Sequence, residues 1–228
     1  MNYKRLLELF WEFALKLEEL HALYLDSLVG YSILYERLHA HQDAVRALLG
    51  DHECSTEEFQ NTCSIVYKNL SNKDYTPVSM SPVMKQGAMK QRVVDDGKNA
   101  LLLGNQCIVS AYAYWEEYLR IEIGKAVGVL QEGAEADDNT RVILNKHVAS
   151  DLWGDLRYIR NSIIHHNGIA NSDIARCKLI KFFSPGQRIE LNHERMRAIF
   201  LAMGRYRNEL HSMSLPSHPK LRIPSGKG

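Results

Sequence analysis

Arg160, Asn161 and His165 lie close together in the sequence and combine three groups that suit chemistry at a phosphodiester. The guanidinium of Arg160 carries a permanent charge and a planar set of donors that matches phosphate oxygens. The imidazole of His165 can accept and release a proton near neutral pH. The carboxamide of Asn161 lies one helical turn before His165, where it can orient the imidazole or hold a phosphate. These three residues are our catalytic candidates, with proton transfer by His165 and charge stabilisation by Arg160.

The residues around these candidates predict a helix that begins near Ser150 or Asp151. Apolar side chains recur at spacings of four, three and four residues and form one helical stripe: Leu152, Leu156, Ile159 and Ile163. Asn167 and Gly168 follow, and both residue types tolerate the left-handed backbone angles that end a helix. The stripe should face the core, which leaves the catalytic candidates on the other side of the helix.

The face opposite the stripe mixes polar side chains with two bulky apolar ones, Trp153 and Ile164. Such a surface is poorly suited to full exposure and poorly suited to a core, and it fits a half-buried contact with a second chain. We therefore predict a twofold homodimer with Trp153 and Ile164 at the interface. The dimer would bring two sets of catalytic candidates together.

Three further residues are candidates for binding the substrate: Arg157, His166 and Asn167. Arg157 lies on the polar face and suits a phosphate, although pairing with an acid explains it equally well. His166 lies near the apolar stripe, so a structural role is the alternative interpretation of its ring.

The stretch from Arg160 to His165 resembles the signature of the HEPN superfamily, which is Arg, a polar residue that is often Asn, and His after four intervening positions. The segment 114–119 is similar to the family's aromatic–Glu–Tyr–Leu pattern, whereas residues 1–90 match no such pattern. The resemblance implies an all-α helical bundle. It also implies that the chain is a metal-independent endoribonuclease, as many members of the family are within toxin–antitoxin or antiviral defence systems.

The resemblance carries expectations about products and partners. The cleft would be composite, built from two chains, and cleavage of RNA would leave a 2′,3′-cyclic phosphate and a 5′-hydroxyl. No cofactor and no metal ion are expected. The partners would be RNA, a second copy of the chain, and an antitoxin or another defence-system protein. Some members carry a tyrosine two residues after the histidine, which a nucleotidyltransferase modifies, but Asn167 occupies that position here.

Two other classes of function remain open. A protein of the same fold could be a non-catalytic dimer that binds RNA, a nucleotide or a protein partner. The chain could also be an α-helical scaffold whose acidic N-terminal region is the interaction element. In both cases Arg160 and His165 would be cations at a helix end, bonded to the last carbonyls or to a carboxylate.

The composition is that of an ordinary globular protein, with 45% hydrophobic residues, 24% charged residues and a formal net charge of +1. The charge is unevenly distributed, because residues 1–60 are mainly acidic and residues 141–188 are mainly basic. A polyanion would be attracted to the basic region. The alternative is charge complementarity within the chain or between subunits.

The four cysteines form no Cys-x-x-Cys pair, and their spacing suggests neither a zinc site nor a set of disulfides. Reduced thiols in a cytoplasmic protein are therefore expected. Glu8 and Glu12 interrupt the first apolar run, which argues against a signal peptide, and no stretch is apolar enough to span a bilayer.

We predict a single HEPN-like helical domain over residues 1–213 and an irregular tail over 214–228. Within the domain, residues 1–70 are the N-terminal helices, 71–90 a long loop, and 91–213 the core that bears the motif.

Three local features of this domain are also predicted. Residues 3–49 form either one long helix or a hairpin of two helices. Ser55 should cap the helix that follows, which should extend to about Leu70. A small β-hairpin with a Pro–Gly turn is predicted over residues 177–191, before a final helix that Asn192 caps.

Overall fold

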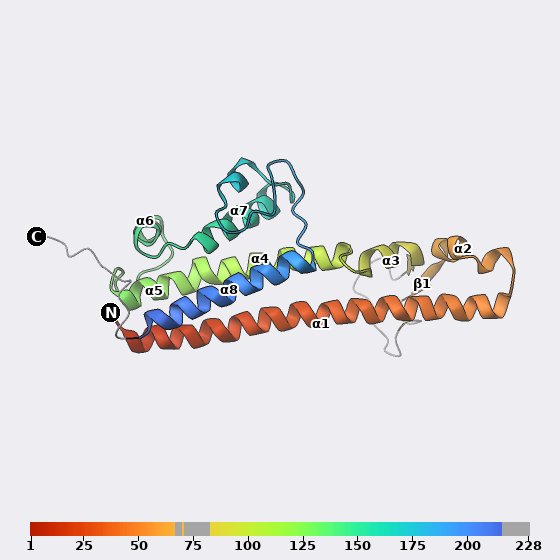
Figure 1. Cartoon of the computed structure of the whole chain (residues 1–228), viewed down its shortest axis with the longest axis horizontal. Helices are drawn as coiled ribbons and strands as arrows, with labels where there is room; N and C mark the ends of the chain where they lie inside the picture. Colours follow the sequence, from red (N-terminus) through yellow and green to blue (C-terminus); the bar gives the residue numbers. More distant parts are fainter. Residues whose placement is uncertain (67–69, 71–82, 216–228) are drawn as a thin grey trace, which may run out of the picture. The chain divides into compact units, whose positions relative to one another are not determined.

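The computed structural model describes residues 1–66, 70 and 83–215, and this part of the chain is mainly helical, as the all-α prediction requires. The helices, labelled in Figure 1, are α1 (Tyr3–Leu49), α2 (Glu57–Thr62), α3 (Gln86–Val93), α4 (Lys98–Tyr114), α5 (Arg120–Val127), α6 (Asp138–His147), α7 (Asp151–His165) and α8 (His193–Met213). Shorter helical turns are η1 (Glu53–Ser55), the π-helical η3 (Trp115–Leu119) and η4 (Ser172–Arg176). Strands β1 (Ser64–Val66) and β2 (Val83–Lys85) pair in antiparallel fashion.

The chain divides into two compact units. Unit 1 comprises Met1–Ala22 and the residues from Gly104 onward, and unit 2 comprises Leu23–Leu103. The catalytic candidates and every other candidate site residue belong to unit 1.

Residues 3–49 form one helix of 47 residues, which decides between the two arrangements that the sequence left open. Gly30 lies inside α1 without ending it. Gly50 directly follows α1 with φ +62°, the left-handed conformation that glycine adopts without strain, and its N–H bonds the carbonyl of Arg46. The glycine therefore ends the helix as the sequence indicated.

Unit 2 corrects two local predictions. Thr56, not Ser55, caps α2 by accepting the N–H of Phe59, and the helix ends at Thr62. Residues 83–90 of the predicted loop form β2 and the first part of α3, while residues 71–82 lie outside the described part of the chain. The buried residues Leu38, Ile65, Leu70 and Met89 pack together into a small core. This core explains why residues 83–90 form regular structure.

Unit 1 is organised around a cluster of aromatic rings from four elements. Trp115 of η3 stacks on Trp153 of α7 with ring centroids 4.8 Å apart and an interplanar angle of 4°. Tyr206 of α8 and Phe13 of α1 meet the Trp153 ring edge-on, at 5.8 Å and 6.0 Å. Burial of these large rings supplies much of the apolar contact that holds the four elements together.

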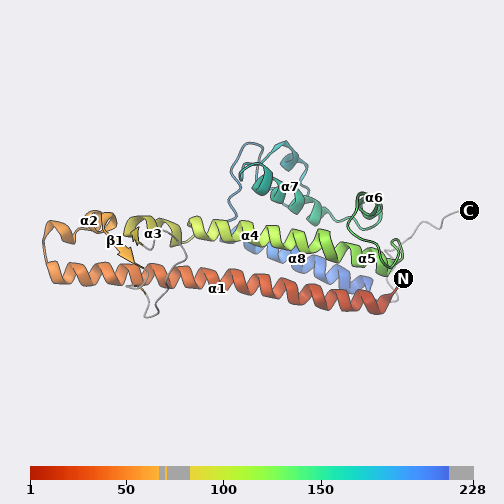
Figure 2. The same ribbon diagram turned by 180° about the vertical axis from the view of Figure 1, so that it is seen from behind.

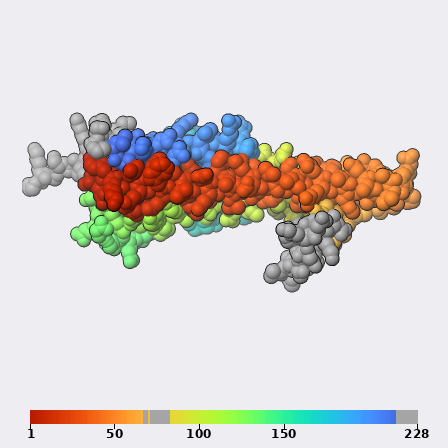
Figure 3. Space-filling view, turned by 90° about the horizontal axis from the view of Figure 1, so that it is seen from below, coloured from red at the N-terminus to blue at the C-terminus, as the bar shows by residue number. Residues whose placement is uncertain are grey.

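The remaining packing of unit 1 follows the sequence patterns. Figures 1 and 2 show α8 running alongside the first turns of α1 and alongside α4, and Figure 3 shows the same neighbourhood of α1 and α8 from below. Asn192 caps α8 by accepting the N–H of Arg195, as predicted. A Cβ on Gly104 would lie 2.8 Å from the carbonyl oxygen of Leu191, so only glycine permits α4 to approach the start of α8 this closely.

The predicted β-hairpin over residues 177–191 is wrong. No strand is assigned to these residues, and the segment 187–189 instead pairs with 168–170, through the bridge between Ile169 and Arg188. The Ser184–Gln187 turn does form, with Gly186 at φ +84°. The physical reason is that a side chain of α7, described below, takes up the backbone N–H groups that a hairpin strand would have used.

None of the described helices is both long enough and apolar enough to cross a membrane.

Candidate functional site

Helix α7 brings the three catalytic candidates into contact at its C-terminal end. Nη1 of Arg160 lies 3.0 Å from Oδ1 of Asn161 and 3.3 Å from Nε2 of His165. The apolar stripe of the same helix packs into unit 1, with Leu152, Leu156 and Ile159 almost fully buried. Because the stripe fixes the rotation of α7, the catalytic candidates lie toward solvent, with His165 exposed and Arg160 half-buried.

The guanidinium of Arg160 faces the imidazole of His165. Arginine has only donors, so a hydrogen bond between the two side chains uses Nε2 of His165 as the acceptor and requires the tautomer with the proton on Nδ1. An unprotonated Nε2 at an exposed position is a suitable general base. Oδ1 of Asn161 accepts a hydrogen bond from Nη1 of Arg160, so the amide positions the guanidinium, which is neither of the two roles that the sequence suggested for it.

The backbone after α7 turns sharply and returns a basic residue to the site. Asn167 and Gly168 have φ +50° and +73°, the left-handed conformation that the sequence predicted, and the N–H of Gly168 bonds the carbonyl of Ser162. The bridge between Ile169 and Arg188 then places Arg188 beside this helix end. Its guanidinium lies 3.9 Å from the position that a Cβ on Gly168 would occupy.

Several arginines lie on or beside α7, and three of them have no acidic partner among the described residues. Within the described part of the chain, Arg157, Arg160 and Arg188 form no ion pair with a carboxylate. Arg157 and Arg176 both lie over the ring of Tyr158, 5.1 Å and 5.3 Å from its centroid. Uncompensated cations on an exposed surface attract a polyanion, which agrees with the basic character of residues 141–188.

The other substrate-binding candidates are exposed. The exposed ring of His166 follows the end of α7 and contacts the side chain of Asn171 at 3.3 Å. The ring therefore does not pack with the apolar stripe, as the sequence had suggested. Asn167 is exposed as well. Arg157, His166 and Asn167 are therefore accessible to a ligand, although the structure shows no contact that joins them to one another.

The two predicted interface residues have different environments. Trp153 is 2% exposed and lies inside the aromatic cluster, so its assignment to a dimer interface is wrong. Ile164 is 43% exposed, directly before His165, and is available for contact with another chain. On an ideal helical wheel Trp153 lies on the face opposite the apolar stripe, which is why the sequence placed it at an interface. In the structure α1, η3 and α8 surround the start of α7 on that side as well, so the residue is buried.

Asp155 is a buried carboxylate of α7 that the sequence analysis did not single out. Its carboxylate is 2% exposed and accepts the backbone N–H groups of Lys178, Leu179 and Ile180 at 2.7–3.1 Å. A buried charge is tolerated when several donors satisfy it in this way. An acidic residue between Leu152 and Leu156 in the apolar stripe was the signal that could have revealed it.

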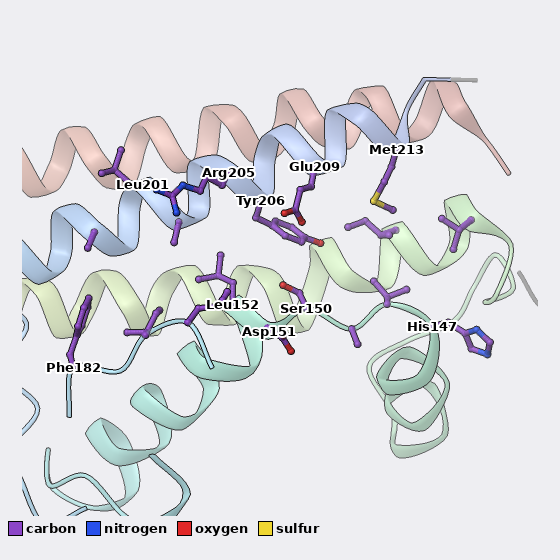
Figure 4. Close-up of a pocket in the computed structure, with 18 residues that line it drawn as sticks. His147, Ser150, Asp151, Leu152, Phe182, Leu201, Arg205, Tyr206, Glu209 and Met213 are labelled. Atoms are coloured by element: carbon purple, nitrogen blue, oxygen red, sulfur yellow. The ribbon is translucent and has the colours of Figure 1, made fainter. Parts of the chain in front are cut away.

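Two cavities adjoin α7. The larger, of about 870 Å³, is shown in Figure 4, and its lining residues include Leu152 of α7, Phe182, and Tyr206 and Met213 of α8. The smaller, of about 270 Å³, lies between η3 and the first turns of α7 and includes Arg157 among its lining residues. Burial, together with the carboxylate of Glu116, raises the pKa of Tyr112 in its wall to about 12, so the phenol remains a hydroxyl donor to Glu116 at neutral pH.

Among the described residues, no three His, Cys, Asp or Glu side chains lie together in a way that could hold a metal ion. Comparisons with protein-family models, with curated proteins and with solved structures find no match to this chain.

Proposed function

We propose that this protein is a metal-independent endoribonuclease of the HEPN type. The observation that carries the proposal is that Asn161 and His165 both contact one nitrogen, Nη1 of Arg160, at an exposed helix end. The surrounding unpaired arginines favour a polyanionic substrate. A toxin–antitoxin or antiviral setting, with an antitoxin or defence-system protein as partner, belongs to the same proposal.

The residues support a defined sequence of proton transfers. A scissile phosphate takes over the donors of Arg160, which frees Nε2 of His165 to accept the proton of the 2′-hydroxyl. The 2′-oxygen then attacks phosphorus while Arg160 stabilises the charge on the equatorial oxygens. The bond from phosphorus to the 5′-oxygen breaks, and that oxygen receives a proton. The products are a 2′,3′-cyclic phosphate and a 5′-hydroxyl.

One chain supplies a single imidazole, while the reaction needs both a base and an acid. We propose that a twofold homodimer provides the second His165, in its protonated imidazolium form, as the acid that donates a proton to the leaving oxygen, while the first His165 is neutral and acts as the base. The dimer would be cytoplasmic and would require no cofactor.

A non-catalytic RNA-binding dimer is the second candidate, because the unpaired guanidinium groups alone would hold a phosphate backbone. Incubation of the purified protein with a single-stranded RNA, with and without EDTA, separates the two functions. We expect fragments that end in a 2′,3′-cyclic phosphate at the same rate in both samples. Binding without fragments, or fragments that disappear on chelation, would overturn the ribonuclease proposal.

The dimer itself can be tested through Ile164. Ile164→Asp places a charge where an apolar side chain would be covered by the second chain, and it should shift the protein from dimer to monomer in sedimentation velocity at micromolar concentration. The rate of RNA cleavage should fall with the dimer fraction. Val142→Asp is the matched control, because Val142 is 69% exposed on α6 and should leave both properties unchanged. A wild-type monomer that cleaves RNA would refute the composite site.

A further inference from the structure

Two arginines from different elements lie against one tyrosine ring of α7. The ring belongs to Tyr158, which is 9% exposed. The guanidinium carbon of Arg157, the preceding residue, lies 5.1 Å from the ring centroid, and that of Arg176, the last residue of η4, lies 5.3 Å from it. Contacts of this kind hold a cation against an aromatic ring. The buried ring therefore gives two exposed guanidinium groups a defined position.

The segment that carries Arg176 is anchored to α7 by buried groups. Ile174 of η4 is 2% exposed, and η4 contacts α7. Two residues after Arg176, the N–H of Lys178 donates to the buried carboxylate of Asp155 at 2.9 Å. The backbone on both sides of Arg176 is thus fixed against α7. The tertiary structure, and not the sequence of one helix, brings Arg176 to the same ring as Arg157.

The neighbouring acids do not neutralise both cations. Arg157 forms no ion pair with a carboxylate within the described part of the chain. Arg176 pairs with Asp173 at 3.4 Å, but these side chains are 66% and 48% exposed, so solvent screens the pair. Two like charges beside one ring repel each other, and an anion bound to both relieves the repulsion. The arrangement therefore favours an anionic ligand with several oxygen acceptors.

Arg157 connects this pair of cations with the catalytic candidates. It lies three residues before Arg160 on α7. Residues at this spacing are neighbours on a helix surface, with Cβ atoms roughly 5–6 Å apart. Nη1 of Arg160 in turn lies 3.3 Å from Nε2 of His165. A nucleic-acid strand that places one phosphate on Arg160 thus brings an adjacent phosphate near Arg157 and Arg176.

We propose that Arg157 and Arg176 form a second phosphate subsite, which binds the phosphate next to the scissile one. Planar guanidinium groups match the oxygens of a phosphate. The substrate is accordingly an RNA strand with at least one phosphate beyond the one that is cut. Phosphate contacts carry no base information, so the subsite adds affinity and fixes the register of the strand. The inference rests on the proposed ribonuclease function, for which it defines the shortest good substrate.

The first test measures binding without cleavage. A short single-stranded RNA with 2′-O-methyl groups lacks the attacking hydroxyl, so its Kd for the full chain can be followed between about 50 and about 200 mM salt. Loss of one phosphate contact lowers the slope of log Kd against log salt by about 0.7 for a single strand. We expect this decrease in the double variant Arg157→Ala with Arg176→Ala. The double variant with lysine at both positions should retain the slope, because lysine keeps the charge.

Arg195→Ala is the matched control for the loss of a cation–ring contact. Arg195 also lies over an aromatic ring, 4.9 Å from the centroid of Phe183, but it belongs to α8. Its replacement should leave the salt slope unchanged. An unchanged slope in the double alanine variant, an equal decrease in Arg195→Ala, or no binding by the wild type would overturn the subsite.

The second test compares the cleavage of three short substrates. The dinucleoside monophosphate UpU has only the scissile phosphate, whereas pUpU and UpUp add one phosphate at either end. We expect the wild-type kcat/KM for one of the extended substrates to exceed that for UpU by about tenfold or more. This ratio should fall toward one in Arg176→Ala and should persist in Arg195→Ala. Equal kcat/KM values for all three substrates in the wild type would contradict the inference.

The two tests distinguish failure of the subsite from failure of the ribonuclease. RNA cleavage by the wild type, with a salt slope that does not depend on Arg157 and Arg176, overturns the subsite and leaves the ribonuclease intact. The expected change in slope without cleavage of any RNA overturns the ribonuclease and retains the two arginines as a phosphate-binding element.

Discussion

Replacement of His165 or Arg160 by alanine is expected to lower the rate of RNA cleavage by about 10²–10⁴-fold. His165 supplies the proton acceptor for the 2′-hydroxyl, and Arg160, whose Nη1 lies beside Nε2 of His165, supplies the charge that stabilises the phosphorane. Because both residues act on one transition state, the double variant should be little slower than either single variant.

The fold should survive these two substitutions. Neither side chain belongs to the buried stripe of α7, and both lie toward solvent. Circular dichroism and thermal melting should therefore give the wild-type result for both variants. Arg197→Ala is a matched control, since Arg197 is exposed on α8 and should leave the cleavage rate unchanged. Cleavage by His165→Ala at the wild-type rate would remove the acid–base role and place the RNA-binding dimer first.

Replacement of Asp155 by alanine is expected to lower the free energy of unfolding by roughly 3–5 kcal/mol. The carboxylate satisfies three consecutive backbone N–H groups, and the substitution leaves all three without an acceptor in a region where Leu156 and Ile180 are buried. Asp155→Asn should have a smaller effect, because the amide retains one oxygen that can accept but presents its own donors to the remaining N–H groups.

Urea denaturation monitored by tryptophan fluorescence measures this effect, since Trp11, Trp115 and Trp153 all belong to unit 1. Asp151→Ala is the control from the same helix. Asp151 is exposed and pairs with Nζ of Lys178 at 2.6 Å, and because solvent screens such an exposed ion pair, its removal should change stability far less than removal of the Asp155 carboxylate. Equal denaturation midpoints for Asp155→Ala and Asp151→Ala would show that the buried carboxylate is not what holds residues 178–180.

The sequence by itself determined the features that depend on neighbouring residues. The periodic apolar positions of α7 and the left-handed pair Asn167–Gly168 predicted the helix and its end. Asn192 predicted the start of α8 by the same local logic, because a side-chain oxygen caps the N–H groups of its own next turn. The contacts of Arg160 with Asn161 and His165 also involve only residues of one helix end, although spacings of one and five residues are not those at which helical side chains face each other, so the sequence did not predict them.

The tertiary structure alone decided the features that depend on distant residues. Residues 177–183 have the composition of a strand, yet Asp155 takes up the N–H groups of three of them and no strand partner forms. Trp153 lies on the polar arc of an isolated helix, yet three other elements bury it. In both cases the outcome depends on which groups from remote parts of the chain reach the residue, and sequence periodicity carries no information about such contacts.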